Sequence, residues 1–473
     1  MPCRQRPAGG FVAVVTKQIE AGRALTDIYP ARFCTLCRKE DAMSKQRIQL
    51  SDHFTYSRLL RFVLPCIGTM LFTSIYGIVD GLCVSNFVGK TAFAAVNLIM
   101  PLPTLLGTIG FMLGTGGSAI VGITLGEGDQ KKADRYFTLF LLAALVSVSV
   151  LAVLGIVFLR PIAVLLGAKG ELLDYAVRYG RILMVSLPTF ALQNMFQSFF
   201  VTAEKPHLGF WFTVGAGCTN MVLDVLMVGI WGWGVEGAAI ATFISQLVGG
   251  VLPVFYFIDR SNSSRLHLCK TSFYSKVLRD ACINGSSELM TNLSMSLVNI
   301  LYNYQLLRLA GENGVAAYGV IMYAAFLFVA VFVGYAVGSA PIVSFHYGAR
   351  NHAEVHNLYR KSLRLIAVVA VTLTLASMFI IPCVARIFVG YDAELLALTS
   401  RAFRLYALSF LIMGFNVYAS SFFTALGDGV TSALISFLRT LAFQVIAILL
   451  LPLLLGIDGI WLAVTAAELA ALA

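Results

Sequence analysis

Long apolar stretches alternate with short polar loops along most of this chain. A helix needs about 17–25 apolar residues to cross a bilayer. Runs of this kind occur at 59–86, 92–124, 136–159, 176–203, 207–230, 233–258, 277–310, 314–345, 362–385, 398–426, 430–452 and 457–473. The pattern predicts an all-α polytopic membrane protein with twelve transmembrane helices.

The second half of this pattern repeats the first at an offset of 222 or 223 residues. The segment SAIV at 118–121 matches APIV at 340–343, and GVEG at 234–237 matches GIDG at 456–459. Six crossings are an even number, so the second copy enters the membrane in the same orientation as the first. We therefore expect two six-helix bundles that form a parallel internal repeat, as in many secondary transporters.

Polar segments mark the expected boundaries of these bundles. Residues 1–54 lack apolar periodicity and are expected to form an N-terminal cytoplasmic segment, partly disordered, with Met43 as a natural start. The bundles are expected at 55–258 and 276–473, with a cytoplasmic linker at 259–275. The last span ends at Ala473 after about 17 residues, which is short for a crossing helix. We expect this final helix to be truncated.

The charge balance fits a membrane protein better than a soluble one. Only 12% of the residues are charged and 58% are hydrophobic, whereas soluble domains carry about 25% charged residues. Lys and Arg are most frequent in the loops on the side of the N-terminus, which predicts that this terminus lies inside the cell. The net charge of +10 follows from that bias and does not indicate nucleic-acid binding. We expect a monomer whose surroundings are the lipid bilayer of a bacterial cytoplasmic membrane.

A few ionisable residues remain inside the predicted spans, where a charge is costly and usually faces a cavity or a partner. The acidic residues singled out among them are Asp80, Asp224, Glu288 and Glu468.

Oxygen-bearing side chains gather at one depth of the first bundle. Asn220 and Asp224 are four residues apart on one helix, as are Thr242 and Gln246 on the next. At 1.5 Å per residue, Asp80, Asp224 and Thr242 reach a similar level in the outer half of the membrane. Two carboxylates with an amide and a hydroxyl provide the oxygen ligands that a desolvated cation needs. Two nearby carboxylates also repel each other when both are charged, so the same cluster could carry a proton near neutral pH. The alternative is that these buried polar side chains are fully hydrogen-bonded to one another and serve only to hold the helices together.

A proline and the internal repeat add to this picture. Pro65 removes a hydrogen bond within the first span and permits bending, so it is a candidate hinge coupled to Asp80. In the repeat, Asp80 corresponds to Tyr302 and Pro65 to Ser287. The second bundle thus keeps the scaffold without this acid, which favours a functional role for Asp80.

Several segments resemble the multidrug and toxic compound extrusion (MATE) family, specifically its bacterial MepA-like and DinF-like branch. They are Leu64-Pro65, the segment VDG at 79–81, FVGK at 87–90 and AAVN at 94–97, and the resemblance covers about 55–473. It implies two six-helix bundles around an outward-open cavity and cation-driven export. It also implies a cation site formed by Asp80, Asn194, Asn220, Asp224 and Thr242, although the depth count places Asn194 deeper.

The leading interpretation is an antiporter, not an enzyme, that exports amphipathic or cationic drugs in exchange for H⁺ or Na⁺. No cofactor is expected besides the transported ion, and no metal site beyond Na⁺ at the cation site. The residues expected to face the drug cavity are Tyr76, Gln193, Gln246, Glu288 and Met322. The sequence leaves the choice between H⁺ and Na⁺ open.

Two alternatives are less consistent with the ionisable residues. A lipid-linked oligosaccharide flippase of the same superfamily tends to place several arginines in its cavity, whereas the intramembrane ionisable residues here are mostly acidic, which favours a cationic cargo. A membrane-embedded prenyl-transfer enzyme would need Asp-rich motifs at helix ends, and none is visible. A Walker sequence is also missing, so ATP is not expected to drive transport directly.

Overall fold

The computed structural model describes residues 48–88, 90–390 and 392–473, and Gln49–Ala473 form one compact unit. Most of the predicted N-terminal segment 1–54, including Met43, lies outside the described residues. Within them the chain is helical, and no strand is found there. The predicted fold class is therefore confirmed for the part of the chain that the structure describes.

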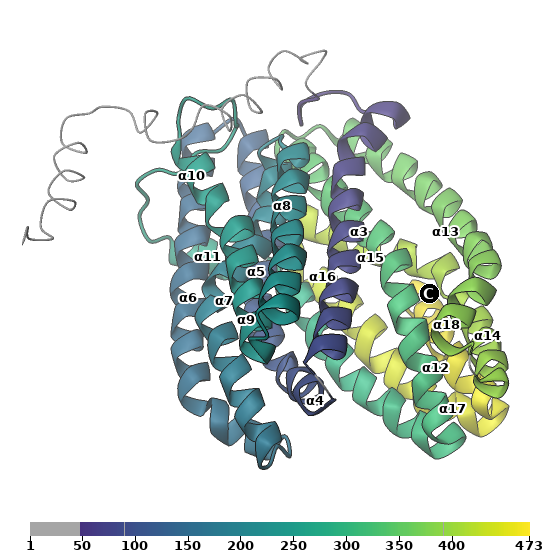
Figure 1. Ribbon diagram of the computed structural model, residues 1–473. Coiled ribbons are helices and arrows are strands. Elements are labelled where there is room, and N and C mark those ends of the chain that lie inside the picture. Colours follow the sequence, from purple (N-terminus) through teal and green to yellow (C-terminus); the bar gives the residue numbers. More distant parts are fainter. Residues whose placement is uncertain (1–47, 89, 391) are drawn as a thin grey trace, which may run out of the picture. The chain divides into compact units, whose positions relative to one another are not determined.

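Two sets of helices make up this unit (Figure 1). The first set, here called the N lobe, contains α3 (Tyr56–Phe87), α4 (Lys90–Ile99), α5 (Pro101–Gly126), α6 (Gln130–Leu165), α7 (Glu171–Thr202), α8 (Pro206–Asp224), the π-helix η2 (Val225–Ile230), α9 (Gly234–Gly250) and α10 (Leu252–Ile258). The second set, the C lobe, contains α11 (Ser275–Asn284), α12 (Ser286–Gly348), α13 (His352–Val389), α14 (Ala393–Ala407), α15 (Phe410–Ala425), α16 (Gly429–Phe437), the π-helix η3 (Leu438–Ala442), α17 (Phe443–Leu455) and α18 (Ile457–Leu472).

Some spans are divided or bent. Among the described residues, eight helices are long and apolar enough to cross a membrane, or nine if α14 and α15, which meet at 47°, count as one span. The 63-residue α12 changes direction at Gly311, where φ is 61° and ψ is −151°. With α12 divided there, and with α7 and the short α18 included, the fold contains the twelve predicted spans.

Two predicted spans contain breaks that hydropathy did not show. The span at 92–124 divides at Met100, because Pro101 lacks a backbone N–H and starts a new helix. The span at 277–310 is interrupted at Gly285, where a Cβ would lie 1.9 Å from the carbonyl oxygen of Met112. Only glycine permits so close an approach of two backbones.

The turns and ion pairs show the internal repeat directly. Gly234, the first residue of α9, and Gly456, directly before α18, have φ of 59° and 60°. Asp129 and Asn351 cap α6 and α13 by accepting from the backbone N–H three residues ahead. The pairs Arg178–Glu236 and Arg401–Asp458 occupy equivalent positions in the two lobes. The two lobes are thus built on the same plan.

The lobes meet where α5 crosses the second half of α12. A Cβ on Gly122 would lie 2.2 Å from Oγ of Ser344, its partner in the repeat. Likewise, a Cβ on Gly126 would lie 2.0 Å from the Phe345 carbonyl oxygen, and one on its repeat partner Gly348 would lie 2.1 Å from that of Ile123. Because equivalent residues touch one another, the pseudo-twofold axis passes through this crossing.

The first helix of each lobe packs on the second helix of the other. In the N lobe, α3 runs along α12, and a Cβ on Gly334 would lie 2.5 Å from Ile67 Cα. In the C lobe, α11 lies along α5 through the contact of Gly285 with Met112. We call the end of the unit where α3 begins, and where α5 and α6 meet, the entry face.

Candidate functional site

Two aspartates from neighbouring helices meet inside the N lobe. Asp80 lies on α3, and Asp224 is the last residue of α8. Their carboxyl groups are near enough to interact directly. The side chain of Asp224 is fully buried, at 0% exposure. Two adjacent carboxylates repel each other unless a proton or a cation lies between them.

Local sequence explains why these helices come so close. Gly217 on α8 lies against Phe72 and Tyr76 of α3, and a Cβ there would lie 2.5 Å from Phe72 and 3.0 Å from Tyr76. Directly after Asp224 the chain continues as the π-helix η2. Single π turns inside helices are often found at functional sites. They change the direction in which the following side chains point.

Several polar atoms on α3, α7, α8 and α9 are buried without a hydrogen-bond partner. Buried polar groups are normally paired, and each unpaired one costs about 1–3 kcal/mol. The atoms concerned are Asp80 Oδ1, Asn194 Nδ2, Asn220 Nδ2, Asp224 Oδ1 and Oδ2, Thr242 Oγ1 and Gln246 Oε1. The carboxylate, hydroxyl and glutamine oxygens among these atoms are of the type that ligates a small cation, whereas the two Nδ2 atoms are donors. The two carboxylates would hold and neutralise such a cation.

The predicted ligands do not all lie at one depth. Asn220 and Asp224 share α8, and Thr242 and Gln246 share α9, which packs on α8 and η2. Asn194 lies on α7, whose Tyr179 interacts with both carboxyl groups. At 1.5 Å per residue, about 22 Å of helix separates Asn194 from Tyr179. Asn194 therefore lies closer to the entry face than the aspartates.

Tyr179 is a site residue that the sequence did not reveal. Its side chain is 1% exposed and lies near both Asp80 and Asp224. A tyrosine in an apolar span is usually a packing residue, so only the depth count applied to α7 could have indicated it. Tyr76 also interacts with Asp80, so it belongs to this cluster.

Pro65 is buried within a helix that continues through it. Helix α3 runs from Tyr56 to Phe87 with Pro65 inside, and Thr69 Oγ1 donates to the Pro65 carbonyl at 2.9 Å. The next residues, Cys66 and Ile67, pack against Gly334 of α12. Pro65 thus lies next to the contact between lobes, and its role as a hinge stays a prediction.

A separate cavity of about 410 Å³ lies in the C lobe and reaches α5 and α7. Of the residues predicted to face a cavity, Glu288 and Met322 line this one. Gln193 instead packs on Gly249, where a Cβ would lie 2.8 Å from the glutamine, and Gln246 is buried on α9. The cavity walls are rich in methionine and aromatic side chains, namely Met295, Tyr302, Tyr318, Met322, Phe326, Tyr406 and Met413.

The polar end of this cavity carries a buried ion pair. Arg439 on η3 and Glu468 on α18 lie 3.2 Å apart, and Asn416 donates to Glu468 Oε2 at 2.7 Å. Glu288 interacts with the charge of Arg439 from α12. The sequence indicates Glu468 as an intramembrane acid but not its pairing with Arg439. The available signal was one arginine in the apolar run 430–452.

Comparisons with known proteins agree with this architecture. The MatE family model matches residues 65–226 and 289–450, once in each lobe. The multidrug export protein MepA of Staphylococcus saprophyticus subsp. saprophyticus is 21% identical over 411 residues, which are 86% of this chain and 88% of the relative. MepA of Staphylococcus aureus is 22% identical over 421 residues, covering 88% and 92%.

A solved structure shares the fold. It shows the outward-facing conformation of a multidrug resistance MATE family transporter of the MOP superfamily, with a TM-score of 0.85 and 23% identity over 90% of this chain and 95% of that one. Since the family model covers more than half of the sequence and recurs in both repeats, this chain belongs to the MatE family.

Proposed function

We propose that this chain is a multidrug efflux transporter of a bacterial cell membrane, driven by the inward flow of H⁺ or Na⁺. The interacting pair Asp80–Asp224, with further unpaired polar atoms on α8 and α9, carries the proposal. The relatives named multidrug export protein MepA support the direction of transport and the bacterial setting. The abundance of Lys and Arg in the loops of the entry face supports a cytoplasmic position for that face.

Coupling would follow from electrostatics at the aspartates. A cation between Asp80 and Asp224 removes their repulsion and favours a close approach of α3 and α8. When the cation leaves, the repulsion returns and favours separation of these helices. Because α3 also packs on α12, a movement of α3 reaches the contact between lobes. Pro65, next to that contact, would let the entry part of α3 bend.

The cavity in the C lobe suits an amphipathic cation. Arg439 and Glu468 neutralise each other, so Glu288 is the acidic group of this cavity that is left to pair with a bound cation. A carboxylate at the end of a pocket lined by Met295, Met322 and aromatic rings attracts an organic cation. Methionine and aromatic side chains adapt to ligands of different shape. We therefore propose cationic amphiphiles as substrates.

The flippase alternative rests on one observation, the presence of Arg439 at the cavity. Its guanidinium already binds Glu468, so the cavity does not present several free cations to a pyrophosphate. This pairing favours drug export over flipping of a lipid-linked oligosaccharide.

Transport in proteoliposomes tests the proposal. Purified protein should expel rhodamine 6G when a Na⁺ or H⁺ gradient is imposed, with the two gradients applied separately. Asp80→Asn should abolish this transport, whereas Glu127→Gln, which changes an exposed carboxylate in the α5–α6 turn, should leave it intact. Transport without either gradient, or at the wild-type rate in Asp80→Asn, would contradict the coupling mechanism.

A further inference from the structure

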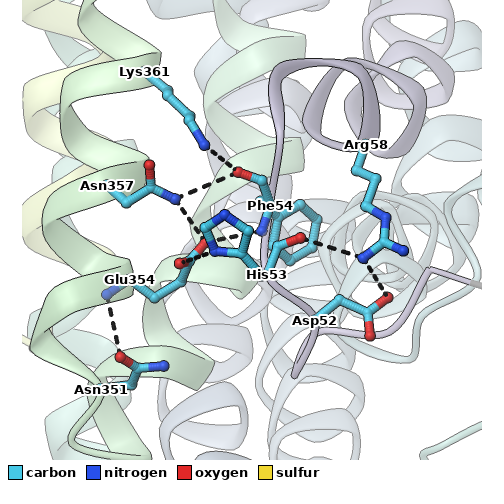
Figure 2. Close-up of polar contacts among 8 residues, drawn as sticks. All are labelled: Asp52, His53, Phe54, Arg58, Asn351, Glu354, Asn357 and Lys361. Atoms are coloured by element: carbon cyan, nitrogen blue, oxygen red, sulfur yellow. Dashed lines mark hydrogen bonds and ion pairs between the residues drawn. The ribbon is translucent and has the colours of Figure 1, made fainter.

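The segment that leads into α3 is bound to the opposite lobe. We call residues 49–55 the entry strap; it continues into the N lobe but docks on α13 of the C lobe (Figure 2). The backbone N–H of Phe54 donates to Glu354 Oε1 at 2.9 Å, and Lys361 Nζ donates to the Phe54 carbonyl at 2.6 Å. His53 Nδ1 lies 2.6 Å from Glu354 Oε2. Glu354 is therefore the main anchor of the strap.

Apolar side chains of the entry strap are buried between the lobes. Phe54 is 0% exposed and contacts the ring of Phe62 on α3 and that of His346 on α12, with centroids 6.1 and 6.4 Å apart. Leu50 is also fully buried. The hydrogen bond from the Phe54 N–H to Glu354 is buried, so this backbone group depends on its protein partner.

The linker between the lobes forms a second strap with the reverse arrangement. We call residues 265–274 the linker strap; it continues into α11 of the C lobe but docks on α6 of the N lobe. The N–H of His267 donates to Asp134 Oδ1 at 3.0 Å, and the N–H of Cys269 donates to Thr138 Oγ1 at 3.1 Å. Further contacts join Thr271 to the Arg135 carbonyl, at 2.8 Å, and Tyr274 to Tyr136.

These two docking sites are equivalent, because α6 and α13 occupy the same position in the repeat. Each lobe thus sends the segment before its first helix onto the third crossing helix of the other lobe. The two straps therefore follow the pseudo-symmetry of the lobes.

Glu204, in the turn between α7 and α8, joins the two straps. Its Oε1 accepts from the Leu50 N–H at 2.9 Å, and the same oxygen accepts from the guanidinium of Arg265. Glu204 has a φ of 62°, and its repeat counterpart is Gly427, with a φ of 82°. Glycine adopts this conformation without strain, whereas glutamate does so at a cost. At the position where the C lobe uses glycine, the N lobe has a carboxylate that binds both straps.

We propose that the two straps form a latch, held by Glu204 and Glu354, that keeps the entry face closed and must release when the lobes separate there. Each strap is covalently part of one lobe and hydrogen-bonded to the other. Opening at the entry face therefore breaks the contacts of the straps, whereas opening at the opposite face leaves them intact. The inference rests on the proposed transport function in that it requires the two faces to open in turn.

Hydrogen exchange on the purified full-length protein tests the latch without any transport measurement. In Glu354→Gln and in Glu204→Gly, exchange should become at least about tenfold faster in the straps and also at the α5–α12 crossing near Gly126 and Gly348. Glu204→Gly removes the carboxylate but relieves the backbone, so it should fold even where Glu354→Gln does not. Glu127→Gln is the control on the same face. Faster exchange confined to the straps, with an unchanged crossing, would show that they do not hold the lobes together.

A reversible cross-link tests release. His53→Cys with Glu354→Cys, in a chain whose native cysteines are replaced, can be joined by a short bis-methanethiosulfonate. The control pair His352→Cys and His356→Cys joins two positions within α13. Rhodamine 6G transport should fall at least about tenfold in the first pair only and return after reduction. Full transport with a complete cross-link would overturn the latch. If neither double variant transports the dye before cross-linking, the proposed transport function is contradicted. The hydrogen-exchange experiment then still decides whether the latch exists.

Discussion

Arg439 on η3 and Glu468 on α18 form an ion pair inside the C lobe, with Nη1 and Oε1 3.2 Å apart. The two residues are 8% and 1% exposed. Asn416 donates to both the side chain and the backbone carbonyl of Glu468, at 2.7 and 2.8 Å, and so fixes this carboxylate. Each charge is removed from water and depends on the other for compensation.

Removal of one partner should therefore be more harmful than removal of both. We expect Arg439→Met to lower the free energy of unfolding by about 3–5 kcal/mol, because it leaves Glu468 charged and buried. The double variant Arg439→Met with Glu468→Gln should recover most of this loss. Thermal unfolding in detergent measures both. Equal losses in the single and double variants would mean that the pair contributes through packing and not through charge.

Each aspartate of the N lobe should be needed for coupling but not for folding. Asp80→Asn and Asp224→Asn each remove one charge from the cation site, so export driven by an ion gradient should be abolished. Both variants should still insert and unfold at a temperature close to that of the wild type, since burial of a neutral amide costs less than burial of a charge. Dye efflux and thermal unfolding of the same samples provide the check. Wild-type efflux in either variant would refute the assignment.

Thr242 should distinguish the two coupling ions. Na⁺ needs neutral oxygen ligands besides the carboxylates, whereas a proton needs only one carboxylate. Thr242→Ala should thus weaken Na⁺-driven efflux and leave H⁺-driven efflux nearly unchanged. If both decline equally, the hydroxyl serves helix packing instead of ion binding.

The glycines at the α5–α12 crossing should tolerate no side chain. A Cβ at Gly126 would lie 2.0 Å from the Phe345 carbonyl oxygen, and one at Gly348 would lie 2.1 Å from that of Ile123. We expect Gly126→Ala and Gly348→Ala each to lower the free energy of unfolding by at least about 1–3 kcal/mol. The two losses should be similar, since the sites are equivalent. Gly319→Ala, whose added Cβ would have no atom within 4 Å, is the control and should be neutral or stabilising. Unfolding temperatures of the three variants decide the matter.

Deletion of residues 1–42 should leave export unchanged. The segment shows no apolar periodicity and precedes Met43, and the entry strap begins only at Gln49. Efflux should be compared at matched expression levels. A loss of export without a loss of protein would assign a function to this segment.

The sequence indicated the crossing segments because hydropathy is a local property: an apolar run long enough to span a membrane must be helical there. The constant offset indicated the two equivalent lobes in the same way. A count of residues along each helix was enough to place Asp80 and Asp224 at one depth. The breaks at Met100 and Gly285 were missed, because a proline in a helical first turn and a contact with another backbone leave no trace in an average of hydropathy.

The sequence by itself thus determined the membrane helices, the parallel repeat and the buried acids, since each follows from composition and spacing along one segment. Only the tertiary structure decided which segments meet: Arg439 with Glu468, Tyr179 with the aspartates, and the two straps with the opposite lobes. These contacts join residues far apart in the chain. Their energy comes from burial and from hydrogen bonds that exist only once the lobes have packed.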